Sequence, residues 1–223
     1  MLIGLSAKKQ CGKNTVCTII KAIDLYYNCD SIHTKGTLKE FVLECLNDDR
    51  LGKITAFRNI ESLWQERSFA CNLRRSLYAI TGDNRIFAQD EKTKEEETAI
   101  KKPEGGYYTI RQLLQKFGTE VGRNISPDIW VDSLLGEYNK AKSGDLEEDW
   151  IITDVRFQNE ANAVREAGGV LLRLNRNTGF KDTHQSEIDL DNYDKFDYII
   201  DNNGTLEELI DKVLIFMSKF DLI

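Results

Sequence analysis

The sequence predicts an α/β fold in which helices flank a parallel β-sheet. Short apolar runs alternate along the chain with segments whose apolar residues recur at helical spacing. The apolar runs are largely continuous, as in strands buried on both faces of a parallel sheet. With 223 residues, 41% of them hydrophobic, the chain is long enough for one globular domain with a full core.

The first half of the chain opens on a strand and continues with helices. Met1–Ser6 (MLIGLS) reads as a buried strand, and Lys13–Tyr27 as a helix with one apolar face. Leu38–Leu46 predicts a second amphipathic helix. Thr55–Leu77 is expected to be helical but mixed in character. The order strand, loop, helix at the start is the one that a phosphate-binding loop requires.

Thr81–Gly106 is the least core-like stretch, rich in charge and turn formers. It reads either as a solvated surface, as charge runs usually do, or as a mobile lid on the substrate side. We expect a single domain over residues 1–223, with this substrate-side or lid insertion at about 48–108.

The second half repeats the alternation of strand and helix. The predicted strands are Trp150–Val155, Val170–Leu174 and Tyr198–Ile200, and the predicted helices are Thr109–Gly122, Asn159–Ala167 and Thr205–Phe220.

Charge and cysteine content narrow the classes of function. The net charge is -7, which argues against a broad nucleic-acid footprint, since that needs a basic face. Five cysteines without C-x-x-C spacing predict free thiols, and the presence of only two histidines argues against a zinc site. No apolar run approaches a bilayer span, and no signal peptide is visible, so we expect a cytoplasmic protein without membrane contact.

Residues 7–15 (AKKQCGKNT) nearly match the phosphate-loop pattern G-x-x-x-x-G-K-[ST]. Ala7 stands at the first glycine, which it can replace only if its φ is negative. Gly12 would let the backbone approach a phosphate, and Lys13 would bridge the outer phosphates. Asn14 stands where a hydroxyl is usual, so Thr15 is the candidate magnesium ligand.

A second polar element follows the strand WIIT. Asp154, Arg156 and Glu160 place two acids and an arginine at the end of a predicted strand. In an open α/β sheet that end faces the ligand crevice. Asp154 reads either as a site carboxylate or as a helix N-cap.

Four stretches of the chain resemble the deoxynucleoside monophosphate kinases of tailed bacteriophages, within the P-loop NMP-kinase group. They are GLSAKKQCGKNTV, TIRQLLQKFGTEVGRNISPDIWVD, WIITDVRFQNEANAVREAGGVLLRLNR and HQSE. The resemblance implies a P-loop NTPase fold and transfer of a phosphoryl group from ATP, with Mg²⁺, to a dNMP for phage DNA precursor synthesis. In that family a homodimer is common, and no direct nucleic-acid partner is implied.

The resemblance also implies roles for single residues. As catalytic residues it implies Lys13, Arg111, Asp154, Arg156 and Glu160. At the ATP phosphates it implies Ala7, Gly12, Lys13, Asn14, Thr15 and Arg173, with Thr15 on magnesium and Asp154 reaching the metal through water. Around the dNMP it implies Thr34, Lys35, Lys39, Arg111, Gln115, Gly118, Thr119, Trp130, Asp154, Arg156 and Glu160.

Helical spacing supports part of this assignment. In a regular α-helix Arg111, Gln115, Gly118 and Thr119 fall on one face. Polar positions of this kind are otherwise solvated, and a lone tryptophan such as Trp130 is otherwise core. Arg173 reads equally as a surface residue. The block of His184, Ser186 and Glu187 carries no role that the sequence explains.

Two other functions stay open. One is another P-loop small-molecule kinase, for example one acting on dephospho-coenzyme A, which would need a different acceptor pocket. The other is a nucleotide-binding regulatory module without turnover, suggested by Ala7 and Asn14. A GTPase is disfavoured, because Asp154 is followed by Val-Arg-Phe and no N-K-x-D motif is present.

Overall fold

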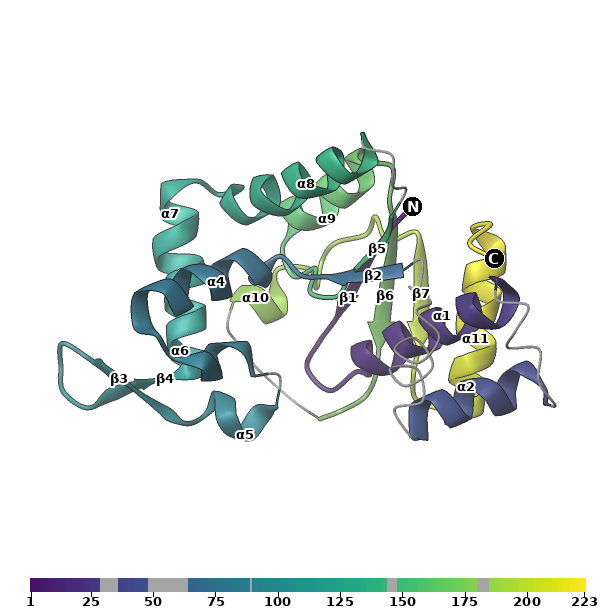
Figure 1. Cartoon of the computed structure of the whole chain (residues 1–223), viewed down its shortest axis with the longest axis horizontal. Helices are drawn as coiled ribbons and strands as arrows, with labels where there is room; N and C mark the ends of the chain where they lie inside the picture. Colours follow the sequence, from purple (N-terminus) through teal and green to yellow (C-terminus); the bar gives the residue numbers. More distant parts are fainter. Residues whose placement is uncertain (29–35, 48–63, 89, 144–147, 180–184) are drawn as a thin grey trace. The chain divides into compact units, whose positions relative to one another are not determined.

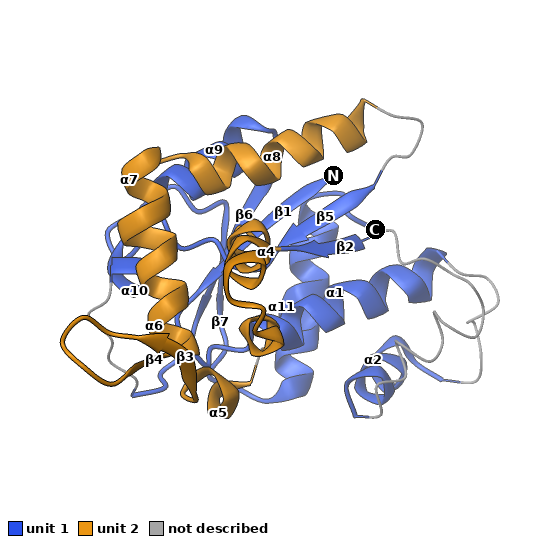
Figure 2. Ribbon diagram, turned by 60° about the vertical axis from the view of Figure 1, so that its left-hand side comes forward, with its two compact units in different colours: residues 1–67, 146–223 blue, residues 68–145 orange. Residues whose placement is uncertain are grey.

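The structure, a computed structural model, describes residues 1–28, 36–47, 64–88, 90–143, 148–179 and 185–223. The chain divides into two units, coloured blue and orange in Figure 2. Unit 1 comprises Met1–Arg67 and Leu146–Ile223, and unit 2 comprises Ser68–Asp145. Unit 2 begins and ends later than the insertion expected at about 48–108, whose action as a lid stays a prediction.

Unit 1 is built on a parallel sheet of five strands in the order β2-β5-β1-β6-β7 (Figure 1). The strands are β1 (Leu2–Ala7), β2 (Trp64–Arg67), β5 (Asp149–Ile152), β6 (Val170–Asn175) and β7 (Tyr198–Asp201). Every pairing in this sheet is parallel, so the predicted α/β fold with a parallel sheet is confirmed. The central strand is β1, which pairs with β5 on one side and β6 on the other.

Helices cover both faces of this sheet. On one face α1 (Lys13–Asn28), α2 (Leu38–Asn47) and α11 (Leu206–Lys219) pack on one another and bury the main core. On the other face α9 (Gln158–Glu166) packs against β1 and β6. A Cβ atom at Gly4 would lie 2.8 Å from Leu171 and 3.0 Å from Val164, which shows how closely this second layer approaches β1.

The edge strand β2 lies within Thr55–Leu77, for which the sequence predicted a helix, so that prediction is wrong over Trp64–Arg67. Trp64 is 2% exposed, Arg67 stacks 4.7 Å from the ring centroid of Trp150, and both belong to a strand that pairs with β5. Four residues with one large apolar side chain give no clear period, so the sequence pattern missed the strand. Helix α4 begins only at Ala70, and residues 55–63 lie outside the described residues.

Unit 2 is mainly helical and carries one antiparallel hairpin (Figure 1). Its elements are α4 (Ala70–Thr81), η2 (Asn84–Phe87), α5 (Glu91–Lys94), β3 (Glu97–Lys101), β4 (Tyr107–Thr109), α6 (Ile110–Gln115), η3 (Lys116–Gly122), α7 (Arg123–Ile125) and α8 (Ile129–Lys142). The charged stretch Thr81–Gly106 therefore forms short helices and the hairpin. No helix in the described ranges is long and apolar enough to cross a membrane.

The predicted helix over Thr109–Gly122 is present but changes type along its length. A capping box between Thr109 and Gln112 starts α6. From Lys116 to Gly122 the helix is a π-helix, η3, whose wider turns appear mostly at functional sites. The regular spacing assumed for Arg111, Gln115, Gly118 and Thr119 therefore holds only to Gln115.

Two glycines let Trp130 close on this π-helix. The indole Nε1 of Trp130 donates a buried hydrogen bond of 2.9 Å to the carbonyl oxygen of Gly118. A Cβ atom at Gly122 would lie 2.4 Å from Trp130 Cζ2, and one at Gly118 would lie 2.5 Å from Leu73 Cδ1. Any larger residue at either position would have to push a buried side chain away.

We predict that Gly122→Ala lowers the free energy of unfolding by about 1–3 kcal/mol, because its methyl group overlaps the Trp130 ring. Gly136→Ala is the matched control, since Gly136 lies in α8 with nothing within 4 Å of the added Cβ. That variant should be stabilised by roughly 0.5–1 kcal/mol. Urea unfolding followed by circular dichroism measures both, and equal effects at the two glycines would contradict the packing described.

Candidate functional site

The polar residues predicted for the site in unit 1 gather at the carboxyl ends of β1, β5 and β6. Residues 8–12 follow β1 and lead into α1, and residues 153–157 follow β5 and lead into α9. Because β1 lies between β5 and β6, these loops border one crevice, where open α/β sheets bind ligands. The sheet thus brings Lys13, Asp154, Arg156 and Arg173 to the same edge, and their roles toward a ligand stay predictions.

The loop after β1 has the backbone of a phosphate-binding loop. Positive φ angles occur at Gln10 (65°) and Gly12 (95°), whereas Ala7 is not among the residues with positive φ. Alanine therefore fits at the first position, as the sequence analysis required. Lys13, the first residue of α1, folds back and donates from Nζ to the Ala7 carbonyl oxygen at 3.0 Å.

Asn202 braces this loop from the end of β7, and the sequence analysis did not select it. Its backbone N–H bonds to the Asn175 carbonyl at 2.7 Å, and its Nδ2 donates to the Cys11 carbonyl at 2.9 Å. A Cβ atom at Gly12 would lie 2.7 Å from the same Nδ2. The buried amide thus explains why position 12 needs glycine. Its only signal in the sequence is a polar residue directly after a strand.

Charged groups surround Lys13 in its partly buried position. Burial, the neighbouring Arg156 and, more weakly, Arg173 together lower the pKa of Lys13 to about 7. Asp154 and Cys11 act in the opposite direction on the same pKa. An anion bound at this position would favour the charged form of Lys13. The site is therefore suited to a multiply charged anion such as a chain of phosphates.

Glu160 shapes the turn that carries Arg156. Its buried carboxylate accepts the backbone N–H groups of Arg156 at 2.8 Å and Phe157 at 3.1 Å, at the start of α9. This is a capping arrangement that fixes the path of the chain after Asp154. Contact of Glu160 itself with a ligand stays a prediction.

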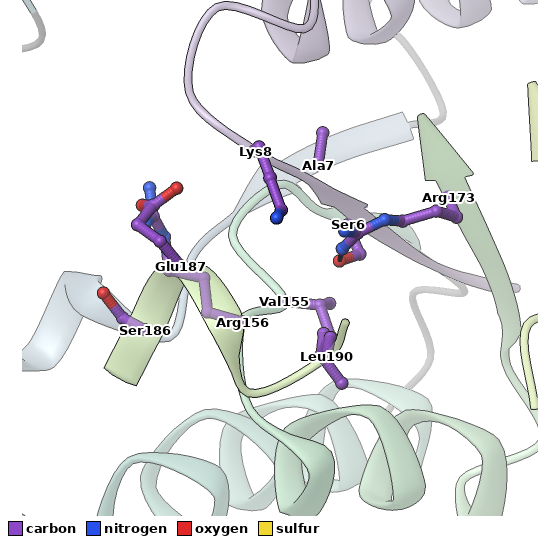
Figure 3. Close-up of a pocket in the computed structure, with 9 residues that line it drawn as sticks. All are labelled: Ser6, Ala7, Lys8, Val155, Arg156, Arg173, Ser186, Glu187 and Leu190. Carbon is purple, nitrogen blue, oxygen red and sulfur yellow. Dashed lines mark hydrogen bonds and ion pairs between the residues drawn. The ribbon is translucent and has the colours of Figure 1, made fainter. Parts of the chain in front are cut away.

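A pocket lies beside the loop and is shown in Figure 3. Its lining residues are Ser6, Ala7, Lys8, Val155, Arg156, Arg173, Ser186, Glu187 and Leu190. Strand register places Arg173 next to Ser6, and its Nη1 donates to the Ser6 hydroxyl at 2.8 Å. Arg173 therefore lines the pocket, and its predicted contact with ATP phosphates stays a prediction.

Two carboxylates from the segment around α10 (Gln185–Ile188) reach these cations, and the sequence analysis assigned them no role. Glu187 accepts a hydrogen bond from Nη1 of Arg156. Asp191 pairs with Lys8 at 2.7 Å and with Arg173 at 3.7 Å. Glu187 belongs to the HQSE block, which was the one sign in the sequence that this residue has a role. His184 of that block lies outside the described residues.

The remaining phosphate-loop residues lie at the start of α1. Asn14 is exposed, and Thr15 is partly exposed in the first turn of the helix. Lys39, predicted at the dNMP, lies on α2 and pairs with Asp211 of α11 at 2.7 Å. Thr34 and Lys35 lie outside the described residues.

The residues predicted for the acceptor in unit 2 are held by their own neighbours. Arg111 forms ion pairs of 2.5 Å with both Glu91 and Glu95 of α5. Gln115 and Thr119 are partly exposed, whereas Gly118 and Trp130 are buried against each other. Ligand contacts of these residues stay predictions.

Comparison with known proteins points to one family. A family model described as deoxynucleotide monophosphate kinase matches residues 50–213. A provisionally named deoxynucleotide monophosphate kinase of Acanthamoeba polyphaga mimivirus is 30% identical over 162 residues, which cover 67% of this chain and 80% of that protein.

Two phage proteins named deoxynucleotide monophosphate kinase are also similar. The one from Enterobacteria phage T4 is 34% identical over 110 residues, covering 48% of this chain and 44% of the phage protein. The one from Escherichia phage RB69 is 31% identical over 108 residues, covering 48% and 43%. The chain thus spans less than half the length of these two relatives, and the family match begins after the phosphate loop.

We predict that Asn202→Ala weakens binding of inorganic tripolyphosphate about 3- to 10-fold, because the Cys11 carbonyl loses its buried donor and the loop loosens. Asn203→Ala is the matched control, since Asn203 accepts from the backbone of Asn177 and does not contact the loop. Isothermal titration calorimetry measures both affinities. Unchanged affinity in Asn202→Ala would show that the amide does not hold the loop.

Proposed function

Because the chain belongs to the deoxynucleotide monophosphate kinase family, we propose that it transfers the γ-phosphoryl group of ATP to a dNMP, giving dNDP and ADP. The observation that carries this proposal is that Lys13, Arg156 and Arg173 lie near one another at one crevice, and that α1 begins at Lys13. Phosphoryl transfer needs mainly positioning and stabilisation of charge, which such a site supplies.

In this proposal the phosphate loop and Lys13 hold the ATP phosphates. Backbone N–H groups of the loop and of the first turn of α1 donate hydrogen bonds to the phosphate oxygens. The positive end of the helix dipole also attracts the phosphates. Ala7, Gly12 and Asn14 shape the loop, and Lys13 exchanges the Ala7 carbonyl for phosphate oxygens. Arg173 approaches the phosphates from β6, where Ser6 orients its guanidinium.

Magnesium is the proposed metal, and the oxygen donors present suit it. The Thr15 hydroxyl lies in the first turn of α1, and Asp154 follows β5 close enough to influence Lys13. Mg²⁺ is usually bound through few protein ligands together with substrate phosphates and water. We propose that Thr15 holds it directly and Asp154 through water, and that when bound it offsets phosphate charge.

On the acceptor side we propose that Arg156 faces the transferring group. Glu160 fixes the backbone of Arg156, whose side chain lines the pocket drawn in Figure 3. Arg111, Gln115 and Thr119 are proposed to contact the dNMP, and Lys39, Thr34 and Lys35 its phosphate. Gly118 and Trp130 are proposed to act by fixing the π-helix that carries Thr119.

The proposed reaction draws on free nucleotides. We therefore propose that the protein acts in the cytoplasm, that of the host cell if a phage encodes it, in the supply of DNA precursors. The proposed small-molecule partners are ATP and a dNMP, with no direct contact with nucleic acid or membrane.

We predict turnover with ATP, Mg²⁺ and at least one of dAMP, dGMP, dCMP, dTMP and a 5-substituted dCMP, measured by coupled release of ADP. Lys13→Ala should lower kcat at least about 100-fold while circular dichroism stays unchanged, because the charge on the phosphates loses its fixed cation. Turnover with dephospho-coenzyme A and with no dNMP would replace the acceptor. Binding of ATP without any transfer would support a regulatory module.

We further predict that Arg156→Ala lowers kcat about 100- to 1,000-fold with little change in the KM for ATP, because Arg156 serves the transferring group. Arg165→Ala is a matched control, since Arg165 also lies on the α9 side but pairs at 3.6 Å with Asp197, away from the pocket. A large rise in the KM for ATP with kcat preserved would move Arg156 to the donor side.

A further inference from the structure

Glu187 connects two parts of the proposed site. One carboxylate oxygen, Oε1, accepts from Nη1 of Arg156, and the other, Oε2, accepts the backbone N–H of Lys9 at 3.3 Å. Lys9 belongs to the phosphate loop, whereas Arg156 belongs to the turn after β5. A single side chain from α10 therefore bridges the two loops that border the crevice; Figure 3 shows Glu187 beside Arg156.

This bridge solves an electrostatic problem. Arg156 lies close enough to Lys13 to disfavour its charge, so the two cations repel each other. Without a partner, a long and flexible arginine would turn toward solvent. The Glu187 side chain is only 10% exposed, and its hydrogen bond to the guanidinium is charge-assisted, which is the stronger kind of hydrogen bond.

The contact leaves Arg156 able to bind a ligand. Within the described residues, Glu187 engages only Nη1 of the guanidinium, which carries five N–H donors. The Arg156 side chain remains 33% exposed and lines the pocket. The geometry thus orients one edge of the guanidinium toward Glu187 and keeps its other donors for an anion.

We propose that Glu187 is a positioning residue for phosphoryl transfer, which holds the Arg156 guanidinium against the phosphate loop. This inference rests on the proposed function. It gives a role to the HQSE block, whose glutamate acts through Arg156 and does not itself touch the reacting groups. The competing role is that of a phosphate mimic, in which the carboxylate occupies the place of the ligand and must leave before binding.

A double-mutant cycle tests the proposal, using Glu187→Gln, Arg156→Ala and the double variant in the full chain. Glutamine keeps the shape of the side chain and one acceptor oxygen. It replaces the other oxygen with an NH2 donor and removes the charge. Glu187→Gln should lower kcat about 10- to 100-fold and change the KM for ATP less than about 3-fold, since misplacement of a catalytic cation acts on transfer. In the Arg156→Ala background the same change should alter kcat less than about 2-fold.

Asp189→Asn is the matched control. Asp189 lies in the same segment, and its carboxylate accepts from the backbone N–H of Gln158 at 2.8 Å and not from the pocket cations. We expect its kcat within about 2-fold of that of the unmodified chain. Melting temperatures of all variants identify any loss of kcat that comes from unfolding. Glu187→Asp keeps the carboxylate but has a shorter side chain, so its kcat should lie between those of Glu187→Gln and the unmodified chain.

Three results would overturn the proposal. An increase in kcat/KM or in tripolyphosphate affinity in Glu187→Gln would identify the carboxylate as a phosphate mimic. Equal losses of kcat in both backgrounds would show that Glu187 acts independently of Arg156. If no dNMP is turned over, the proposed function fails. The affinity of the same variants for tripolyphosphate then tests the bridge: non-additive effects of the two substitutions support it, and additive effects overturn it.

Discussion

The site depends on three cationic side chains, Lys13, Arg156 and Arg173, being held near one edge of the sheet. Side chains of like charge separate unless the fold holds each of them, and here each is held by a different contact. Lys13 bonds to the Ala7 carbonyl, Arg156 to Glu187, and Arg173 to Ser6 and Asp191. The parallel sheet supplies the framework, because it brings the ends of β1, β5 and β6 to one edge. In the proposed function, cations held in this way need little reorganisation when phosphates bind and transfer takes place.

Of the two departures of the loop from the usual pattern, Ala7 has a physical explanation and Asn14 has none. Ala7 is tolerated because its φ is not positive, and the loop places its positive φ angles at Gln10 and Gly12. Gly12 is required twice, by its φ of 95° and by the closeness of Asn202. Asn14 is exposed at the start of α1, and nothing in the described contacts explains why it replaces the usual hydroxyl residue.

The sequence predicted the elements whose pattern is strong and local. The strands β1, β5, β6 and β7 were predicted from short apolar runs, and the helices α1, α2, α9 and α11 from helical spacing or stop signals. Their predicted bounds lie close to those in the structure. The edge strand β2 was missed because a short strand with one large apolar residue has no readable period. The π-helix was missed because nothing in TIRQLLQKFGTEVG distinguishes it from an α-helix until Trp130 is seen against Gly118 and Gly122.

The site shows the same division between local and distant information. Lys13 and Arg156 were found from motifs of adjacent residues, whereas Asn202 and Asp191 act on loops far away in the sequence. Glu187 was noticed in its block but had no role until its distance to Arg156 and Lys9 was known. In unit 2, the ion pairs of Arg111 with Glu91 and Glu95 show that its guanidinium also has carboxylate partners within its own unit.

A crystal structure with ADP, Mg²⁺, aluminium fluoride and an accepted dNMP tests the central claim most directly. We predict that the fluoride group, which stands in for the phosphoryl group in transfer, contacts Lys13 and Arg156, and that Glu187 still accepts from Arg156. A fluoride group bound away from these two cations, or a Glu187 carboxylate displaced from Arg156 by the ligand, would contradict it.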